Sequence, residues 1–106
     1  MDPIISALEE ERIEAKRLIS RYEQELEALP RGSFFLRKLG KNRYGYLTCS
    51  EGGEIRQKYL GRLSEDEIKQ YQQQSERKKK VLGLRNKAEK RYAFLERALK
   101  HAGRQG

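Results

Sequence analysis

The sequence has no tryptophan, one histidine and one cysteine. The single cysteine, Cys49, cannot form an internal disulfide, and no second cysteine or histidine cluster is available to complete a metal site. The only histidine, His101, precedes Gly103 in a segment where we expect the chain to fray, which does not suit a general base. We therefore predict no metal site, no catalytic residue and no cofactor.

Long apolar runs are also missing. No segment reaches the ~20 apolar residues that a membrane-spanning helix needs, and the N-terminal Met1-Asp2-Pro3 leads into an acidic segment rather than a signal peptide. We expect no membrane association. The expected location is cytoplasmic, in a bacterium or in the host of a phage that encodes the protein. Hydrophobic residues make up 36% of the chain and charged residues 38%, a balance that favours long amphipathic helices over a thick core.

Two long helices are predicted, at 3–29 and 65–102, followed by a tail at 103–106. Asp2 with Pro3 is typical of a helix start, and Ser64 with Glu67 forms a capping-box pattern. Apolar residues recur at alternating spacings of three and four, which is typical of a coiled-coil-like seam. The seam residues are Ile5, Leu8, Ala15, Ile19, Tyr22, Leu26 and Leu29 in the first helix, and Ile68, Tyr71, Val81, Leu84, Ala88, Tyr92, Leu95, Leu99 and Ala102 in the second.

Between the helices, residues 33–61 show short apolar and aromatic runs separated by glycine-bearing turns, which predicts three antiparallel strands. The predicted fold class is α+β: one domain, 1–106, in which two long antiparallel helices flank a three-stranded β-meander. A turn at Gly52-Gly53 sets Glu51 opposite Glu54, and therefore Tyr46 opposite Tyr59. A turn at Lys41-Asn42 would set Leu39 opposite Tyr44 and Arg37 opposite Tyr46.

This pairing divides the strand residues between two faces. The more apolar face is expected to pack inward, and the face with three cations to remain at least partly wet. The first carries Phe35, Arg37, Leu39, Tyr44, Tyr46, Thr48, Ile55, Gln57 and Tyr59; the second carries Phe34, Leu36, Lys38, Leu47, Cys49, Arg56, Lys58 and Leu60.

The formal net charge of +8 is unevenly distributed. Residues 1–29 hold four basic and eight acidic side chains, residues 30–63 hold eight and two, and residues 64–106 hold twelve and six. A localised positive field suits a surface that faces phosphates or an acidic partner, although charged runs are also ordinary solvated surfaces.

Cations alternate with aromatic residues in the predicted meander. Lysine and arginine bind phosphates, and tyrosine stacks on bases or donates a hydrogen bond to a phosphate oxygen. The alternative is that the tyrosines are simply the packing face of the sheet. The candidate binding residues are Arg37, Lys38, Lys41, Arg43, Tyr44, Tyr46, Arg56, Lys58, Tyr59 and Arg62.

A second candidate is the run of four consecutive cations in the second helix, Arg77, Lys78, Lys79 and Lys80. Like charges at this density repel and weaken a helix unless a counter-charge relieves them. Three readings stay open: pairing with Glu23, Glu25 and Glu27 of the first helix, a phosphate-binding stripe, or contact with an anionic membrane.

Four segments carry a resemblance to known proteins: Leu29-Pro30-Arg31-Gly32-Ser33, Tyr44-Gly45-Tyr46-Leu47, Glu51-Gly52-Gly53-Glu54-Ile55-Arg56 and Lys58-Tyr59-Leu60-Gly61. They resemble a family of small prokaryotic proteins of unknown function, and the hairpin is similar to the N-terminal hairpin of some insertion-sequence transposases. The resemblance implies a bacterial, phage or mobile-element setting and is compatible with DNA binding. The chain lacks the acidic catalytic domain of those transposases.

Three hypotheses follow. The first is a non-enzymatic protein that binds nucleic acid. The second is an inhibitor from a phage or mobile element, of the anti-CRISPR type, that docks on a nucleic-acid-handling effector and blocks its nucleic-acid site; the acidic first helix favours it. The third is a structural helical-hairpin subunit, and the apolar outer sides of the helices at Ile13, Leu18, Leu82 and Phe94 would suit a homodimer.

Overall fold

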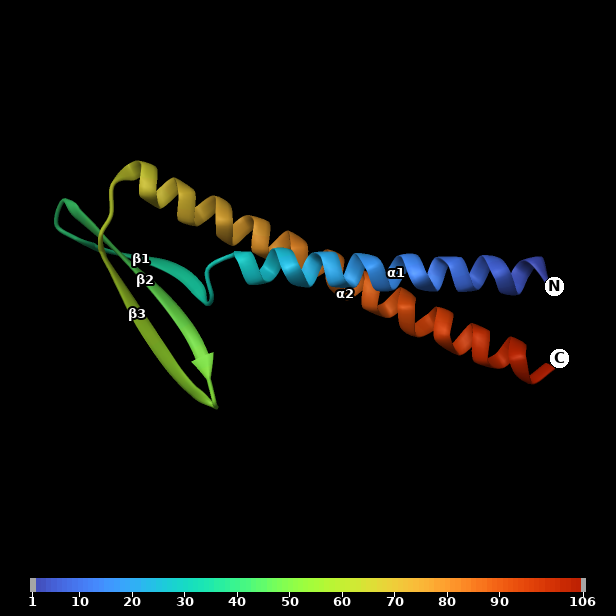
Figure 1. The fold of residues 1–106 in the computed structure, drawn as a ribbon. Coiled ribbons are helices and arrows are strands. Elements are labelled where there is room, and N and C mark those ends of the chain that lie inside the picture. The colour runs from blue at the N-terminus through green and yellow to red at the C-terminus, as the bar shows by residue number, and fades with distance from the viewer. Residues whose placement is uncertain (1, 106) are drawn as a thin grey trace. The chain divides into compact units, whose positions relative to one another are not determined.

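The computed structural model describes residues 2–105, and the side chains of residues 2–103. Helix α1 (Pro3–Ala28) is followed by strands β1 (Ser33–Leu39), β2 (Asn42–Glu51) and β3 (Glu54–Arg62), and then by helix α2 (Glu65–Gln105) (Figure 1). The strands form one antiparallel sheet in the order β1-β2-β3. The α+β class, with two helices and a three-stranded meander, is therefore confirmed.

Both predicted helix starts are capped as expected. The carboxylate of Asp2 accepts a hydrogen bond from the backbone N–H of Ile4 (2.9 Å). Ser64 and Glu67 exchange side-chain-to-backbone bonds of 3.2 Å in both directions, which satisfies two amides that the helix itself leaves unpaired. At its other end α2 continues to Gln105, past the predicted end at 102. A lone glycine such as Gly103 costs a helix only about 1 kcal/mol and does not end it.

The chain divides into two compact units: a helical unit of Met1–Leu26 with Lys80–Gly106, and a sheet unit of Glu27–Lys79. In the helical unit α1 and α2 run in opposite directions (Figure 1). Glu11 accepts a 2.8 Å bond from Arg91, and Arg12 lies 3.8 Å from Glu96. Arg12, which interrupts the predicted apolar seam, is thus half-buried and forms an ion pair between the helices.

The core of the helical unit is narrow. Its buried side chains are those of Ala15, Val81, Ala88 and Leu95, all of them residues of the predicted seams. Tyr92 lies half-buried beside them and donates a 2.9 Å hydrogen bond to Glu96, which raises the pKa of Tyr92 above its usual value because the bond is made to the protonated phenol.

The β2–β3 hairpin has the predicted register, with Glu51 opposite Glu54, Thr48 opposite Gln57 and Tyr46 opposite Tyr59. The predicted β1–β2 register is wrong by two residues. The turn is Gly40-Lys41, so Leu39 pairs with Asn42 and Arg37 pairs with Tyr44. Gly40 has φ +63°, and the first central position of a type II′ turn needs this left-handed conformation, which favours glycine.

Strand β3 contains a bulge that the sequence did not predict. The pairing shifts by one residue between Tyr46–Tyr59 and Gly45–Gly61, so Leu60 is the extra residue, and Gly61 has φ +87°. Without the bulge Tyr44 would pair with Gly61, and Arg62 would point to the other side of the sheet. With it, Arg62 pairs with Tyr44 and shares its face.

The predicted assignment of the two sheet faces is wrong. The inner face, defined here as Phe34, Leu36, Gly45 and Leu47, packs against the first turns of α2. Leu47 is 8% exposed, and the ring of Phe34 stacks on that of Tyr71 with centroids 4.9 Å apart. Phe35, Ile55 and Tyr59, which were expected inside, are exposed.

Complementary shape explains this reversal better than the number of apolar side chains on each face. Gly45 has no side chain, so Leu63 and Phe34 lie directly over its backbone, where a Cβ atom would clash with Leu63. Leu63, which precedes α2, and Ile68, in its first turn, are buried, and the backbone N–H of Leu63 donates a 2.9 Å bond to the carbonyl of Arg43. The helix therefore approaches the face that has a gap for it.

Candidate functional site

The outward side of the sheet carries two rows of side chains that run across the strands. The first row consists of Phe35, Tyr46 and Tyr59, one residue from each strand. Their rings form a continuous series, with centroids 5.1 Å apart for Phe35–Tyr46 and 5.3 Å apart for Tyr46–Tyr59. The interplanar angles are 14° and 46°, within the range of offset and tilted geometries that aromatic pairs prefer.

The second row consists of Arg37, Tyr44 and Arg62, again one residue from each strand. It lies two residues along the strands from the first row, a separation of about 7 Å. Tyr44 connects the rows, because its ring centroid is 6.3 Å from that of Tyr59. We call these six residues the aromatic face.

The aromatic face is accessible to solvent. Phe35 is 40% exposed and Tyr59 58% exposed, whereas Tyr44 and Tyr46 are half-buried by the rings beside them. Sheet residues normally hide such surface, so an exposed aromatic cluster of this kind is typical of a binding surface.

Acidic side chains are absent from the aromatic face. Residues 33–62 contain two carboxylates, Glu51 and Glu54, which flank the Gly52-Gly53 turn and alternate onto the opposite side. Among the described strand residues 33–62, Arg37 and Arg62 therefore share their face with no carboxylate.

The sheet separates the predicted cluster of ten residues. Arg37, Tyr44, Tyr46, Tyr59 and Arg62 come together on the aromatic face. Lys41 lies in the Gly40-Lys41 turn. The other four, all exposed, share the opposite side with the inner face, but around the part that α2 covers: Lys38, Arg43, Arg56 and Lys58.

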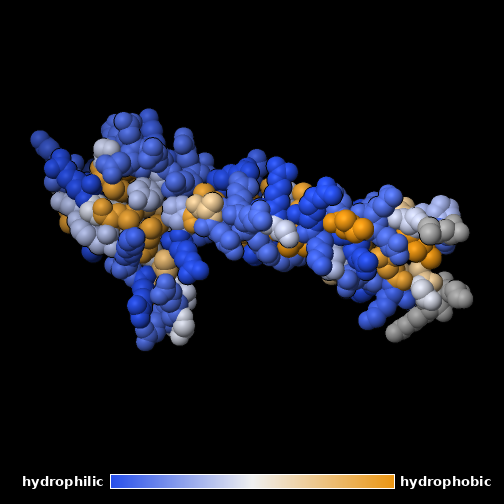
Figure 2. Space-filling view, viewed as in Figure 1, coloured by the Kyte–Doolittle hydropathy of each residue, from blue (hydrophilic) through white to orange (hydrophobic). Residues whose placement is uncertain are grey.

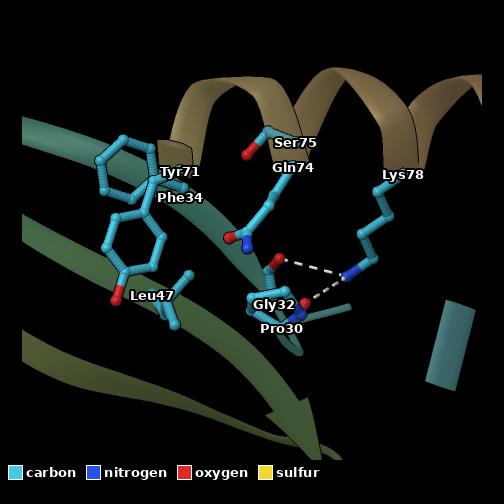
Figure 3. A pocket seen from close by; sticks show the side chains of 8 residues that line it. All are labelled: Pro30, Gly32, Phe34, Leu47, Tyr71, Gln74, Ser75 and Lys78. Atoms are coloured by element: carbon cyan, nitrogen blue, oxygen red, sulfur yellow. Dashed lines mark hydrogen bonds between the residues drawn. The ribbon is translucent and has the colours of Figure 1, made fainter. Parts of the chain in front are cut away.

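One residue of the run of four cations in α2, Lys78, binds backbone carbonyls of the same protein. Lys78 is half-buried, and its ammonium donates to the backbone carbonyls of Pro30 (3.4 Å) and Gly32 (3.2 Å), as Figure 3 shows. None of the three readings of this run included that contact. Consecutive helix positions are rotated by about 100°, so Arg77 and Lys79 project to either side of Lys78 and both are exposed; Lys80, in the helical unit, is exposed as well.

The pocket beside Lys78 is a packing feature. It is lined by Pro30, Gly32, Phe34, Leu47, Tyr71, Gln74, Ser75 and Lys78 and has a volume of ≈ 10 Å³, room for about one water molecule (Figure 3). Gly32 has φ +94°, and a Cβ atom there would lie 2.6 Å from the Thr48 carbonyl oxygen. Lys78 thus stabilises the turn at Pro30–Gly32, whose backbone conformation at position 32 requires glycine.

Three further features of the described residues concern metal sites, membrane helices and the free cysteine. Across the described residues, no group of three or more histidine, cysteine, aspartate or glutamate side chains could hold a metal ion. Within residues 2–105, neither helix is long and apolar enough to cross a membrane. Cys49 is half-buried as a free thiol in β2.

Sequence reasoning missed Phe35 as a candidate binding residue. The signal that could have found it is the glycine at position 40. A turn with Gly40 at its first central position sets Phe35 opposite Tyr46 and completes the aromatic row.

Comparison with known families shows which family the chain belongs to. A family model described as a domain of unknown function (DUF6788) matches residues 8–70. The chain belongs to this family. The matched DUF6788 span contains the whole aromatic face, whereas Arg77–Lys80 lie beyond it. Searches of curated proteins and of solved structures found no match.

Proposed function

We propose that this DUF6788 protein is a non-enzymatic nucleic-acid-binding protein and that the aromatic face is its binding surface. The observation that carries the proposal is the pair of adjacent rows, Phe35–Tyr46–Tyr59 and Arg37–Tyr44–Arg62, on a face without a carboxylate. Arginines supply the phosphate term of the binding energy, and aromatic rings supply stacking with bases.

The cations outside the aromatic face extend the proposal. Lys41 lies in the turn next to the arginine row, and Arg77 and Lys79 are exposed on the part of α2 that belongs to the sheet unit. They would add long-range attraction for a polyanion, a contribution that raises the association rate and weakens with salt.

The setting of the protein is part of the same proposal. The resemblance of the hairpin to that of some insertion-sequence transposases supports a bacterial, phage or mobile-element protein that works in the cytoplasm.

The arrangement in which the two long helices flank the meander also stays a prediction.

A salt series tests the proposal directly. Gel shifts with duplex and single-stranded DNA and RNA are expected to show binding at low salt, with an affinity that falls steeply as salt rises because counterions are released from the phosphates. Absence of binding to all four probes at low salt would exclude the proposal.

Two observations favour a second candidate, the inhibitor that docks on a nucleic-acid-handling effector. The helical unit exposes large apolar side chains at Ile4, Ile13 and Phe94. Residues 1–29 hold twice as many acidic as basic side chains, a charge that would suit a cationic groove. Capture of such an effector by the purified chain after nuclease treatment, lost in an Ile13→Asp variant, would support this function over direct nucleic-acid binding.

A further inference from the structure

The shape of the sheet distinguishes between two kinds of nucleic acid. A B-DNA major groove is about 12 Å wide and admits an α-helix or a two-stranded ribbon. In the three-stranded part of this sheet the outer backbones are already about 10 Å apart, since neighbouring strands are separated by about 4.8 Å. With their side chains, three strands are wider than the two-stranded ribbon that this groove admits.

The two-stranded part of the sheet does not suit a duplex either. The pairing of β1 with β2 ends at Ser33–Thr48, so the tip formed by residues 49–51 and 54–56 has two strands only. Glu51 and Glu54 lie opposite each other there, and Figure 2 shows a hydrophilic surface at this end of the hairpin. The tip holds these two carboxylates and one cation, Arg56, which lies 4.0 Å from Glu54, so its net negative charge would be repelled by the phosphates on either side of a groove.

The ring geometry of the aromatic face suits unpaired bases. Tyr46 has a ring on each side, Phe35 stacked at 14° and Tyr59 tilted at 46°, and it is half-buried. Phe35 and Tyr59 lie on the two outer strands, β1 and β3, and in the described part of the chain the sheet ends there. Phe35 is 40% exposed and Tyr59, which also stacks on Tyr44, is 58% exposed, so a base that is not stacked in a duplex can lie against either ring.

We propose that the ligand of the aromatic face is single-stranded nucleic acid, with bases stacked on the outer sides of Phe35 and Tyr59 and phosphates bound by Arg37 and Arg62. The inference rests on the proposed function and names its substrate class. The bulge at Leu60 is part of this site, because it brings Arg62 onto the same face as the rings. The phosphates then lie about one row, roughly 7 Å, from the stacked bases.

Fluorescence anisotropy tests the preference for unpaired bases. The probes are one mixed-sequence strand of about 12 nucleotides as labelled DNA, the same strand as RNA, and the DNA strand annealed to its complement. We expect at least about fivefold tighter binding to a single strand than to the duplex, since stacking with one base contributes at least ~1 kcal/mol. A preference between the DNA and RNA strands identifies the source of the ligand, because the 2′-hydroxyl is the group that distinguishes them.

Three variants test the role of the ring. Tyr59→Leu is expected to weaken single-strand binding at least about fivefold, and Tyr59→Phe, which keeps the ring, to retain wild-type affinity. Phe94→Leu is the matched control, because Phe94 is an aromatic residue of the helical unit with nearly the same exposure, 57% against 58%. Circular dichroism of each variant checks that the fold is retained.

The outcomes separate the two proposals. If no probe binds at low salt, the proposed function fails and this inference fails with it. If the duplex binds as tightly as the single strands, or if Tyr59→Leu binds like the wild type, this inference is overturned while nucleic-acid binding stands.

Discussion

Phe34 and Phe35 are consecutive residues of β1, yet their rings have different neighbours. The ring of Phe34 stacks on Tyr71 of α2, on the side of the sheet that holds the buried Leu47. The ring of Phe35 stacks on Tyr46 of the neighbouring strand and remains 40% exposed. The inner face therefore joins a helix to a sheet, whereas the aromatic face joins strands only to each other.

Because of this difference, we expect the inner face to determine the stability of the fold and the aromatic face to determine ligand binding. Side chains on the inner face remove apolar surface from water against another element, so their loss leaves a cavity. Side chains on the aromatic face contact neighbours on one side and solvent on the other, so a ligand can replace the solvent. Substitutions on the two faces are expected to change different measurements.

The largest effect is expected on the inner face. Leu47→Ala should lower the free energy of unfolding by about 2–4 kcal/mol, because a nearly buried leucine leaves a cavity under α2. Ile55 lies in the neighbouring strand and is 79% exposed. Ile55→Ala should therefore lower the free energy of unfolding by less than about 0.5 kcal/mol. Urea unfolding measures both, and equal costs would show that the two faces do not differ in this way.

The buried glycine gives the next largest effect. Gly45→Ala should destabilise the protein by about 1–3 kcal/mol, because the new Cβ would clash with Leu63 and approach Phe34. Gly83→Ala is the control with the opposite sign. Gly83 has no atom within 4 Å of its Cβ position in α2, so the alanine should stabilise the helix by about 0.5–1 kcal/mol. Thermal unfolding that moves in the same direction for both variants would contradict the packing at Gly45.

Charge on the two sides of the sheet can be compared at constant net charge. Arg37→Gln with Arg62→Gln should weaken binding to a single-stranded oligonucleotide about tenfold at low salt and reduce the salt slope by about 1.4, the value for two phosphate contacts. Arg43→Gln with Lys58→Gln removes two cations from the opposite side and should cost roughly twofold. If the two pairs weaken binding equally, only the overall charge matters and the aromatic face has no special role.

The bulge gives the smallest expected change. Deletion of Leu60 removes the extra residue, so regular pairing would keep Gly61 opposite Gly45 and Arg62 opposite Tyr44 on the aromatic face. Affinity for the single strand should therefore stay near the wild-type value, whereas a single Arg62→Gln variant should lose about threefold. A folded deletion variant that binds as weakly as Arg62→Gln would show that the bulge itself, rather than the position of Arg62 opposite Tyr44, contributes to binding.

Local signals in the sequence were sufficient for part of this structure. Asp2, Ser64 and Glu67 determine the helix starts through side-chain bonds that act within three residues. The Gly52-Gly53 turn fixed the β2–β3 register, because both glycines have the positive φ that a type I′ turn requires.

The remaining features depend on contacts between distant residues. The bulge at Leu60 has no local signature beyond Gly61, and it decides which face Arg62 joins. The choice of inner face depends on the fit of Leu63 over Gly45, which the number of apolar side chains on each face cannot reveal. Five of the six residues of the aromatic face were among the candidates named from the sequence, whereas Phe35 and the grouping of all six on one face needed the structure.

The most direct test of the binding surface is an NMR titration of the aromatic ring protons with a single-stranded DNA of about 12 nucleotides. We predict large shifts for Phe35 and Tyr59 and none for Phe34 and Tyr71, because stacked bases change the ring environment on the aromatic face alone. Shifts confined to Phe34 and Tyr71, or saturation of binding with no change at Phe35 and Tyr59, would contradict the aromatic face as the binding surface.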